Sequence, residues 1–115
     1  FKYYGGDLTG WSHKGYMPRI ASIYEKSPSK MPFDFTEILG AIAPRALFIN
    51  APVHDSNFDI SGVHDCVDAA KPVYELLKAN DKLMMTTPDA PHDFPPEARN
   101  EAYLFLDREL SLNNK

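Results

Sequence analysis

Two short apolar runs, each followed by a polar loop and separated by about one helix length, constrain this sequence most. The first run, residues 46–50, leads into a loop that contains Asp55. The second run, residues 82–87, leads into a loop that contains His92. A strand, a crossover helix and a parallel return strand take roughly 30 residues or more, and positions 55 and 92 are 37 apart. We therefore expect both loops at one end of a parallel sheet, with the carboxylate facing the imidazole.

A helix is expected directly before the first strand. Asp34 followed three positions later by Glu37 is a pattern typical of a helix start, and Pro44 ends that helix. The run 46–50 then has no alternation of apolar and polar residues. Such a run suits a strand that is buried on both faces of a parallel sheet.

The segment between the two strands is also expected to be helical, starting at Asp59 or Ser61. Pro72 lies in its middle and lacks a backbone donor, which predicts a kink or a break near residues 69–71. The inward stripe of this helix is expected to comprise Val63, Val67, Ala70, Val73 or Tyr74, and Leu77.

A last helix follows the His92 loop and opens at Pro95, Pro96 and Glu97, since proline is favoured in a first helical turn. Its buried face is expected to comprise Ala98, Ala102, Phe105, Leu106 and Leu110. Residues 34–115 thus predict the order helix-strand-helix-strand-helix of an α/β fold. Residues 1–33 are rich in glycine, proline and aromatics, which predicts an irregular segment with one helical turn near residues 19–24.

The length, the net charge and the cysteine content limit the number of domains and the kinds of binding partner. A chain of 115 residues forms one domain at most. A net charge of -4 argues against nucleic acid as the main partner, and no apolar run is long enough to span a membrane. The single cysteine, Cys66, excludes an internal disulfide and leaves the cellular compartment undetermined.

An aspartate that accepts a hydrogen bond from one imidazole nitrogen fixes the tautomer, so that the other nitrogen acts as a base. Asp55 and His92 are therefore the candidate catalytic residues, with Asp59 as a rival acid. The alternative for either residue alone is a turn or capping role. A metal site built from His54, Asp55, His64, Asp65 and Cys66 matches no recognised zinc spacing and is the weaker reading.

The sequence resembles the C-terminal third of an α/β-hydrolase. The segments that carry this resemblance are Leu47-Phe-Ile-Asn, Asp55-x-Asn-Phe, His92-Asp-Phe-Pro, Tyr3-Tyr-Gly-Gly-Asp7, Tyr16-Met-Pro-Arg-Ile20 and Pro32-Phe-Asp-Phe35. They are closest to the esterase branch with dienelactone-hydrolase-like, acetyl-xylan-esterase-like and prolyl-oligopeptidase-like members. The resemblance implies that Asp55 is the triad acid and His92 the triad histidine of a serine esterase that needs no cofactor or metal.

The sequence departs from that family in two respects. The four residues Ala51-Pro-Val-His precede Asp55 where the family often has a tighter turn, which leaves Asp59 as a rival acid. The larger departure is that no Gly-x-Ser-x-Gly motif is present. We therefore expect this chain to be the C-terminal part of one domain, inactive alone, whose N-terminal part carries the serine. The expected substrate is a small-molecule or carbohydrate ester. Two alternatives stay open: a non-catalytic binding or accessory domain on the same scaffold, and a prolyl-oligopeptidase-like peptidase.

Four aromatic side chains of the first segment are suited to stacking on a sugar or an aromatic acyl group: Tyr3, Tyr4, Trp11 and Tyr16. Packing of an irregular segment onto a sheet would explain them equally well.

Overall fold

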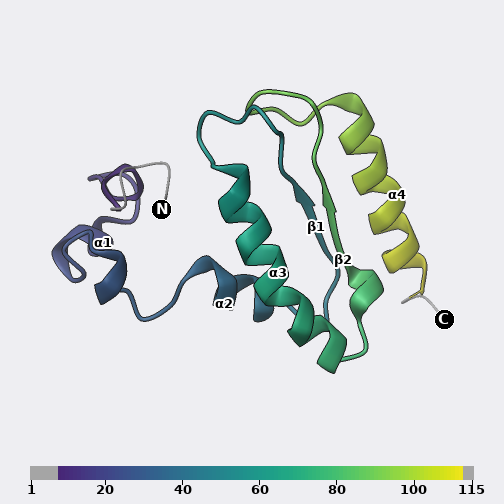
Figure 1. Ribbon diagram of the computed structural model, residues 1–115, viewed down its shortest axis with the longest axis horizontal. Coiled ribbons are helices and arrows are strands. Elements are labelled where there is room, and N and C mark those ends of the chain that lie inside the picture. The colour runs from purple at the N-terminus through teal and green to yellow at the C-terminus, as the bar shows by residue number, and fades with distance from the viewer. Residues whose placement is uncertain (1–7, 113–115) are drawn as a thin grey trace.

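The computed structural model describes residues 8–112 and contains helices and a small parallel sheet (Figure 1). In chain order the elements are η1 (Thr9–Trp11), α1 (Pro18–Ser22), η2 (Pro28–Lys30), α2 (Phe35–Gly40), β1 (Leu47–Asn50), α3 (Ile60–Leu76), η3 (Asn80–Lys82), β2 (Leu83–Thr86) and α4 (Pro96–Leu112), where η marks a 3₁₀ helix. This mixed order is compatible with part of an α/β fold.

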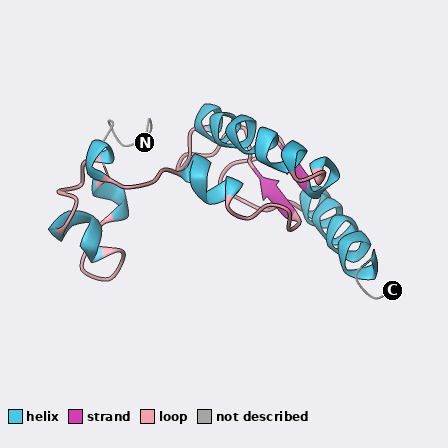
Figure 2. Ribbon diagram, turned by 90° about the horizontal axis from the view of Figure 1, so that it is seen from below, coloured by secondary structure: helices cyan, strands magenta, loops and turns pink. Residues whose placement is uncertain are grey.

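The two strands pair in parallel, and α3 is the crossover between them. Successive side chains of a strand point to opposite faces, so each face receives its own helix. Leu47 and Leu83, which are partners in the register, pack against the buried cluster of Ala70, Tyr74 and Ala79. Phe48 points the other way and contacts the Phe105 ring of α4, with 5.8 Å between ring centroids. Helices thus cover both faces of the sheet, as the two views show (Figures 1 and 2).

The core is centred on α3, where Val67, Ala70 and Tyr74 are buried as the stripe pattern predicted. The Tyr74 hydroxyl donates to the Arg45 carbonyl at 2.9 Å, which fixes the amino end of β1 to the helix. Leu77, expected in the same stripe, is largely exposed. Although helices cover both faces, every residue of β1 is only half-buried, so β1 is less buried than its unbroken apolar run predicted.

Helix α3 also differs from the sequence expectation at Pro72. It runs unbroken from Ile60 to Leu76 with Pro72 inside it, so the expected break near residues 69–71 is absent. Proline removes only one backbone donor. Ala70 and Tyr74 on either side are fully buried against the sheet, and this packing holds the helical path across the missing bond.

Helix α4 begins at Pro96, as expected, but its buried face is shorter than predicted. Ala98, Ala102 and Phe105 are buried, whereas Leu106 and Leu110 are exposed. Glu109 is buried in their place. Its carboxylate pairs with Arg108 at 3.0 Å and lies 3.9 Å from Lys82, which offsets the cost of burying the charge.

Residues 8–33 form short helical turns rather than an extended element, in line with their glycine and proline content. The helix expected near residues 19–24 is α1, one residue earlier. The helix start expected at Asp34 is confirmed, because Asp34 and Glu37 form a reciprocal capping box. None of the helices between residues 8 and 112 combines the length and apolar character that crossing a membrane would require.

Candidate active site

The two loops that follow β1 and β2 run side by side beyond the ends of the strands. Asn50 and Thr86, the last residues of the strands, are partners in the register. Three backbone amides of the first loop continue the pairing by donating to carbonyls of the second: Ala51 to Thr86 at 2.9 Å, Val53 to Pro88 at 3.0 Å and His54 to Ala90 at 3.1 Å. This backbone ladder holds the two loops together up to the residues that carry the polar side chains.

Asp55 and His92 meet at the end of this ladder. Nδ1 of His92 lies 2.8 Å from Oδ2 of Asp55. The other oxygen, Oδ1, accepts from the backbone amides of Asn57 at 2.7 Å and Phe58 at 3.1 Å. The Asp55 side chain is 8% exposed and that of His92 is 52% exposed. The acid is therefore held from both sides, while the imidazole remains open to solvent.

The surroundings of Asp55 favour its ionised form. Burial of the carboxyl raises its pKa, but the hydrogen bond with His92 and the two backbone amides lower it more, and the net pKa lies below the ordinary value. An ionised Asp55 accepts from Nδ1–H, which leaves the lone pair of the imidazole on Nε2. No partner for Nε2 is present within residues 8–112.

The rival acid has a different place. Asp59 lies at the start of α3, where Oδ1 accepts from the Ser61 amide at 2.8 Å. Between the two aspartates, the structure brings Asp55 rather than Asp59 to His92. His64 lies on the exposed surface of α3 and takes no part in the Asp55–His92 contact.

A second histidine–aspartate pair joins the same two loops. Nε2 of His54 lies 2.7 Å from Oδ1 of Asp89, and both side chains are highly exposed, at 69% and 89%. His54 was expected from the sequence to be a solvent-facing loop residue or part of a substrate-side wall, with a metal site as the weaker interpretation. Within the described ranges, no three His, Cys, Asp or Glu side chains form a group able to hold a metal ion.

Aromatic rings extend from His92 toward the N-terminal segment. The Phe58 ring stacks on His92 at 5.8 Å and 29°, and Trp11 contacts Phe58 at 5.8 Å and Phe35 at 5.3 Å. Tyr16 contacts Trp11 at 6.2 Å. Tyr3 and Tyr4, the other two aromatics singled out above, lie outside the described residues.

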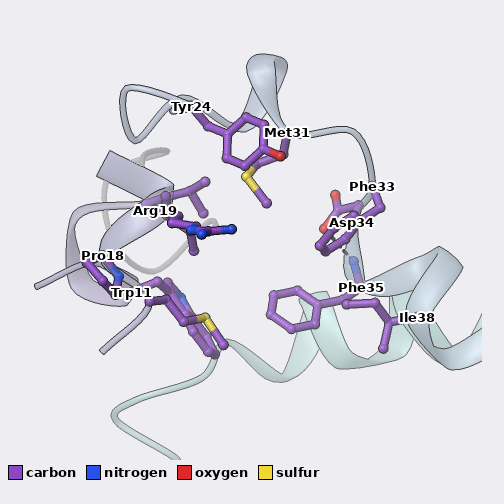
Figure 3. Close-up of a pocket in the computed structure, with 12 residues that line it drawn as sticks. Trp11, Pro18, Arg19, Tyr24, Met31, Phe33, Asp34, Phe35 and Ile38 are labelled. Atoms are coloured by element: carbon purple, nitrogen blue, oxygen red, sulfur yellow. Dashed lines mark hydrogen bonds between the residues drawn. The ribbon is translucent and has the colours of Figure 1, made fainter. Parts of the chain in front are cut away.

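Trp11 also lines a hollow of about 610 Å³ between the N-terminal segment and α2 (Figure 3). The walls are mainly aromatic, aliphatic and methionine side chains. Arg19 and Asp34 are the charged residues of the lining, and they face the hollow from opposite walls (Figure 3). A volume of this size is typical of small-molecule sites.

Asn50, which was expected from the sequence only as the end of a strand, contacts the loop that carries His92. Its Nδ2 donates to the Asp93 carbonyl at 2.9 Å, and its buried Oδ1 has no partner in the described part of the chain. The signal in the sequence that could have drawn attention to Asn50 was a polar residue at the end of an otherwise apolar strand. Burial and the nearby Asp34 and Asp65 charges raise the pKa of the Cys66 thiol, which disfavours the thiolate form that a nucleophile requires.

The parallel strands with helices on both faces are compatible with part of an α/β fold, and the Asp55–His92 pair lies beyond the ends of these strands. The comparisons with known proteins then give the family. The chain belongs to the family described as glucuronyl esterase, fungi, whose model matches residues 10–78. This family comprises carbohydrate esterases of the α/β-hydrolase superfamily, which agrees with the resemblance found in the sequence, and a role in carboxylic ester hydrolysis is indicated.

The family match has a defined extent. It contains β1 and Asp55 and ends before β2 and His92. The matching family is not one of the three named from the sequence. Comparisons with curated proteins and with solved structures found no significant match.

Proposed function

We propose that this chain supplies the acid and the histidine of a Ser-Asp-His triad in a serine hydrolase that cleaves carboxylic esters, and that the serine lies outside the chain. The observation that carries the proposal is the 2.8 Å contact between His92 Nδ1 and Asp55 Oδ2 in a chain of an esterase family. In α/β-hydrolases the triad runs in the chain order nucleophile, acid, histidine, which agrees with Asp55 before His92.

In this mechanism Nε2 of His92 takes the proton of the serine hydroxyl as Oγ attacks the ester carbonyl. The imidazolium that forms is stabilised by Asp55, which stays ionised. The imidazolium of His92 passes its Nε2 proton to the leaving alcohol when the ester C–O bond breaks. Water then attacks the acyl-enzyme with His92 again as the base, and the acid product and the free serine are released. No step needs a cofactor.

We further propose that the substrate is an ester of a small molecule or a carbohydrate. The family description supports a uronic acid as the acyl part. The hollow beside Trp11 is then placed to hold a part of the substrate remote from the reacting bond, since Trp11 contacts Phe58 and Phe58 stacks on His92. The resemblance to acetyl-xylan-esterase-like proteins also favours a carbohydrate ester.

A non-catalytic binding domain is the second candidate function, and the observation in its favour is the absence of a Gly-x-Ser-x-Gly motif from these 115 residues. In that case the Asp55–His92 pair would only brace the two loops. A prolyl-oligopeptidase-like peptidase is the third, and comparing turnover of an ester with that of a prolyl peptide separates it from an esterase.

The decisive experiment compares His92→Ala with His64→Ala in the complete protein, using hydrolysis of a glucuronate ester as the readout. Loss of a triad member is expected to lower kcat by about 10³-fold or more. His64 is an exposed histidine of α3, so its removal should leave kcat unchanged. Activity of His92→Ala close to that of the unmodified protein would exclude the triad and leave the binding domain as the better proposal.

A further inference from the structure

We infer that Asn50 is a positioning residue for the reaction, acting through His92. This inference rests on the proposed function, because the group that Asn50 positions is the proposed base. Asn50 ends β1, and its side chain spans 43 positions of sequence to donate from Nδ2 to the Asp93 carbonyl at 2.9 Å. Asp93 directly follows His92.

The reason for this assignment is how the backbone around His92 is held. The ladder between the two loops ends where the His54 amide donates to the Ala90 carbonyl at 3.1 Å. The Asn50 amide then holds the Asp93 carbonyl. Only Pro91 and His92 lie between these two anchors. The backbone that carries the imidazole is therefore held by a hydrogen bond on each side, and one of these two hydrogen bonds comes from a side chain, that of Asn50.

The chemistry of the amide group supports a dedicated role. A carbonyl oxygen accepts only, so the NH₂ group of Asn50 must face Asp93, and this fixes the orientation of the amide. The opposite atom, Oδ1, is buried with no partner among residues 8–112. An unsatisfied buried acceptor disfavours folding, and an apolar residue at the end of this apolar strand would avoid it. The donor at Nδ2 is the group that accounts for an asparagine here.

The role also explains how His92 keeps its orientation although its side chain is half exposed. The contact with Asp55 orients the ring from one nitrogen only, and rotation of the backbone at residues 91–93 would carry the ring away from that carboxylate. Asn50 restrains this rotation. Positioning errors of about 1 Å are enough to reduce rates by roughly 10²-fold.

The test is a double-mutant cycle in the complete protein with Asn50→Ala, His92→Ala and the double variant, assayed by ester hydrolysis. Asn50→Ala is expected to lower kcat by about 10- to 100-fold with KM within about twofold. In the His92→Ala background the same substitution should change the residual rate by less than about twofold, because no imidazole remains to be positioned.

A matched control is Tyr74→Phe. It removes another side-chain donor to a backbone carbonyl, also at 2.9 Å, at the opposite end of β1. Tyr74→Phe should lower Tm and leave kcat unchanged. The ¹⁵N chemical shifts of the His92 ring provide a second readout, since they should move in Asn50→Ala and stay in Tyr74→Phe.

Two outcomes would overturn the inference. The first is a kcat of Asn50→Ala within twofold of that of the unmodified protein. The second is that Asn50→Ala lowers the residual rate of His92→Ala by the same factor as it lowers kcat of the unmodified protein. Failure of the proposed function would give a different result, because the single variant His92→Ala would then keep its activity.

Discussion

His54 and Asp89 form a histidine–aspartate contact of 2.7 Å across the same two loops that His92 and Asp55 join at 2.8 Å, with the roles of the loops reversed. The first loop gives a histidine to one pair and an acid to the other. The two contacts have nearly the same length, and they differ in burial. The carboxylate of Asp55 is 8% exposed, whereas that of Asp89 is 89% exposed.

This difference predicts that the two pairs respond unequally to mutation. His54→Ala should change kcat by less than about threefold, because an exposed ion pair is screened by water and salt. Asp55→Asn should lower kcat by about 10³- to 10⁴-fold, because an amide in place of the carboxylate favours the wrong tautomer of His92. Steady-state ester hydrolysis at low and high salt measures both. If His54→Ala were the more damaging variant, the outer pair would have to replace the inner one in the mechanism.

The aromatic rings beside His92 predict that one substitution lowers mainly kcat and another raises mainly KM. Phe58→Leu removes the ring stacked on the imidazole and should lower kcat by about 3- to 10-fold, in keeping with the strength of aromatic pairs. Trp11→Leu, one ring further away, should raise KM by about 10-fold with little change in kcat.

Phe48→Leu is the matched control for these two variants. Phe48 contacts Phe105 at 5.8 Å, the same separation as the Phe58–His92 pair, but on the face of the sheet covered by α4. It should lower Tm and leave both kinetic constants unchanged. A fall in kcat in the control as large as that in Phe58→Leu would mean that the effect is general loosening of the fold.

The lowered pKa of Asp55 predicts acid-sensitive stability. A carboxyl whose folded pKa lies below its unfolded value of about 3.9 stabilises the fold above that value. This contribution is lost as the pH falls through the folded pKa. Thermal unfolding of Asp55→Asn and the unmodified protein should therefore differ most near neutral pH and converge toward pH 3. A difference in Tm that does not shrink on acidification would contradict this origin.

The sequence was sufficient to predict the features that depend on local pattern or on simple topology. The capping box at Asp34 follows from two residues three positions apart. The approach of Asp55 to His92 follows from two strands that enclose one helix, although the catalytic role of the pair stays a proposal. Pattern was misleading at Leu106 and Leu110, because helical spacing does not reveal how far the neighbouring strands extend.

The contacts that the sequence could not reveal are those between side chains and distant backbone. Nothing local to Asn50 indicates that its amide reaches Asp93. The stacking of Phe58 on His92 likewise depends on the path of the loop after Asp55. That path is set by two hydrogen bonds, which the backbone amides of Asn57 and Phe58 donate to the Asp55 carboxylate. Such contacts depend on three-dimensional positions that no periodicity encodes.

The register of the two strands has a consequence for how proteins with this arrangement can vary in length. Leu47 pairs with Leu83 and Asn50 with Thr86, so both loops depart from the same level of the sheet. An insertion inside α3 leaves that level untouched, but it turns the residues that follow it by about 100° and would move buried side chains such as Tyr74 out of the core. A residue inserted between Asn50 and Asp55 shifts the acid by up to about 3.3 Å relative to the imidazole. An insertion before Asp55 thus disturbs the Asp55–His92 contact, whereas one inside α3 disturbs the core that supports the strands.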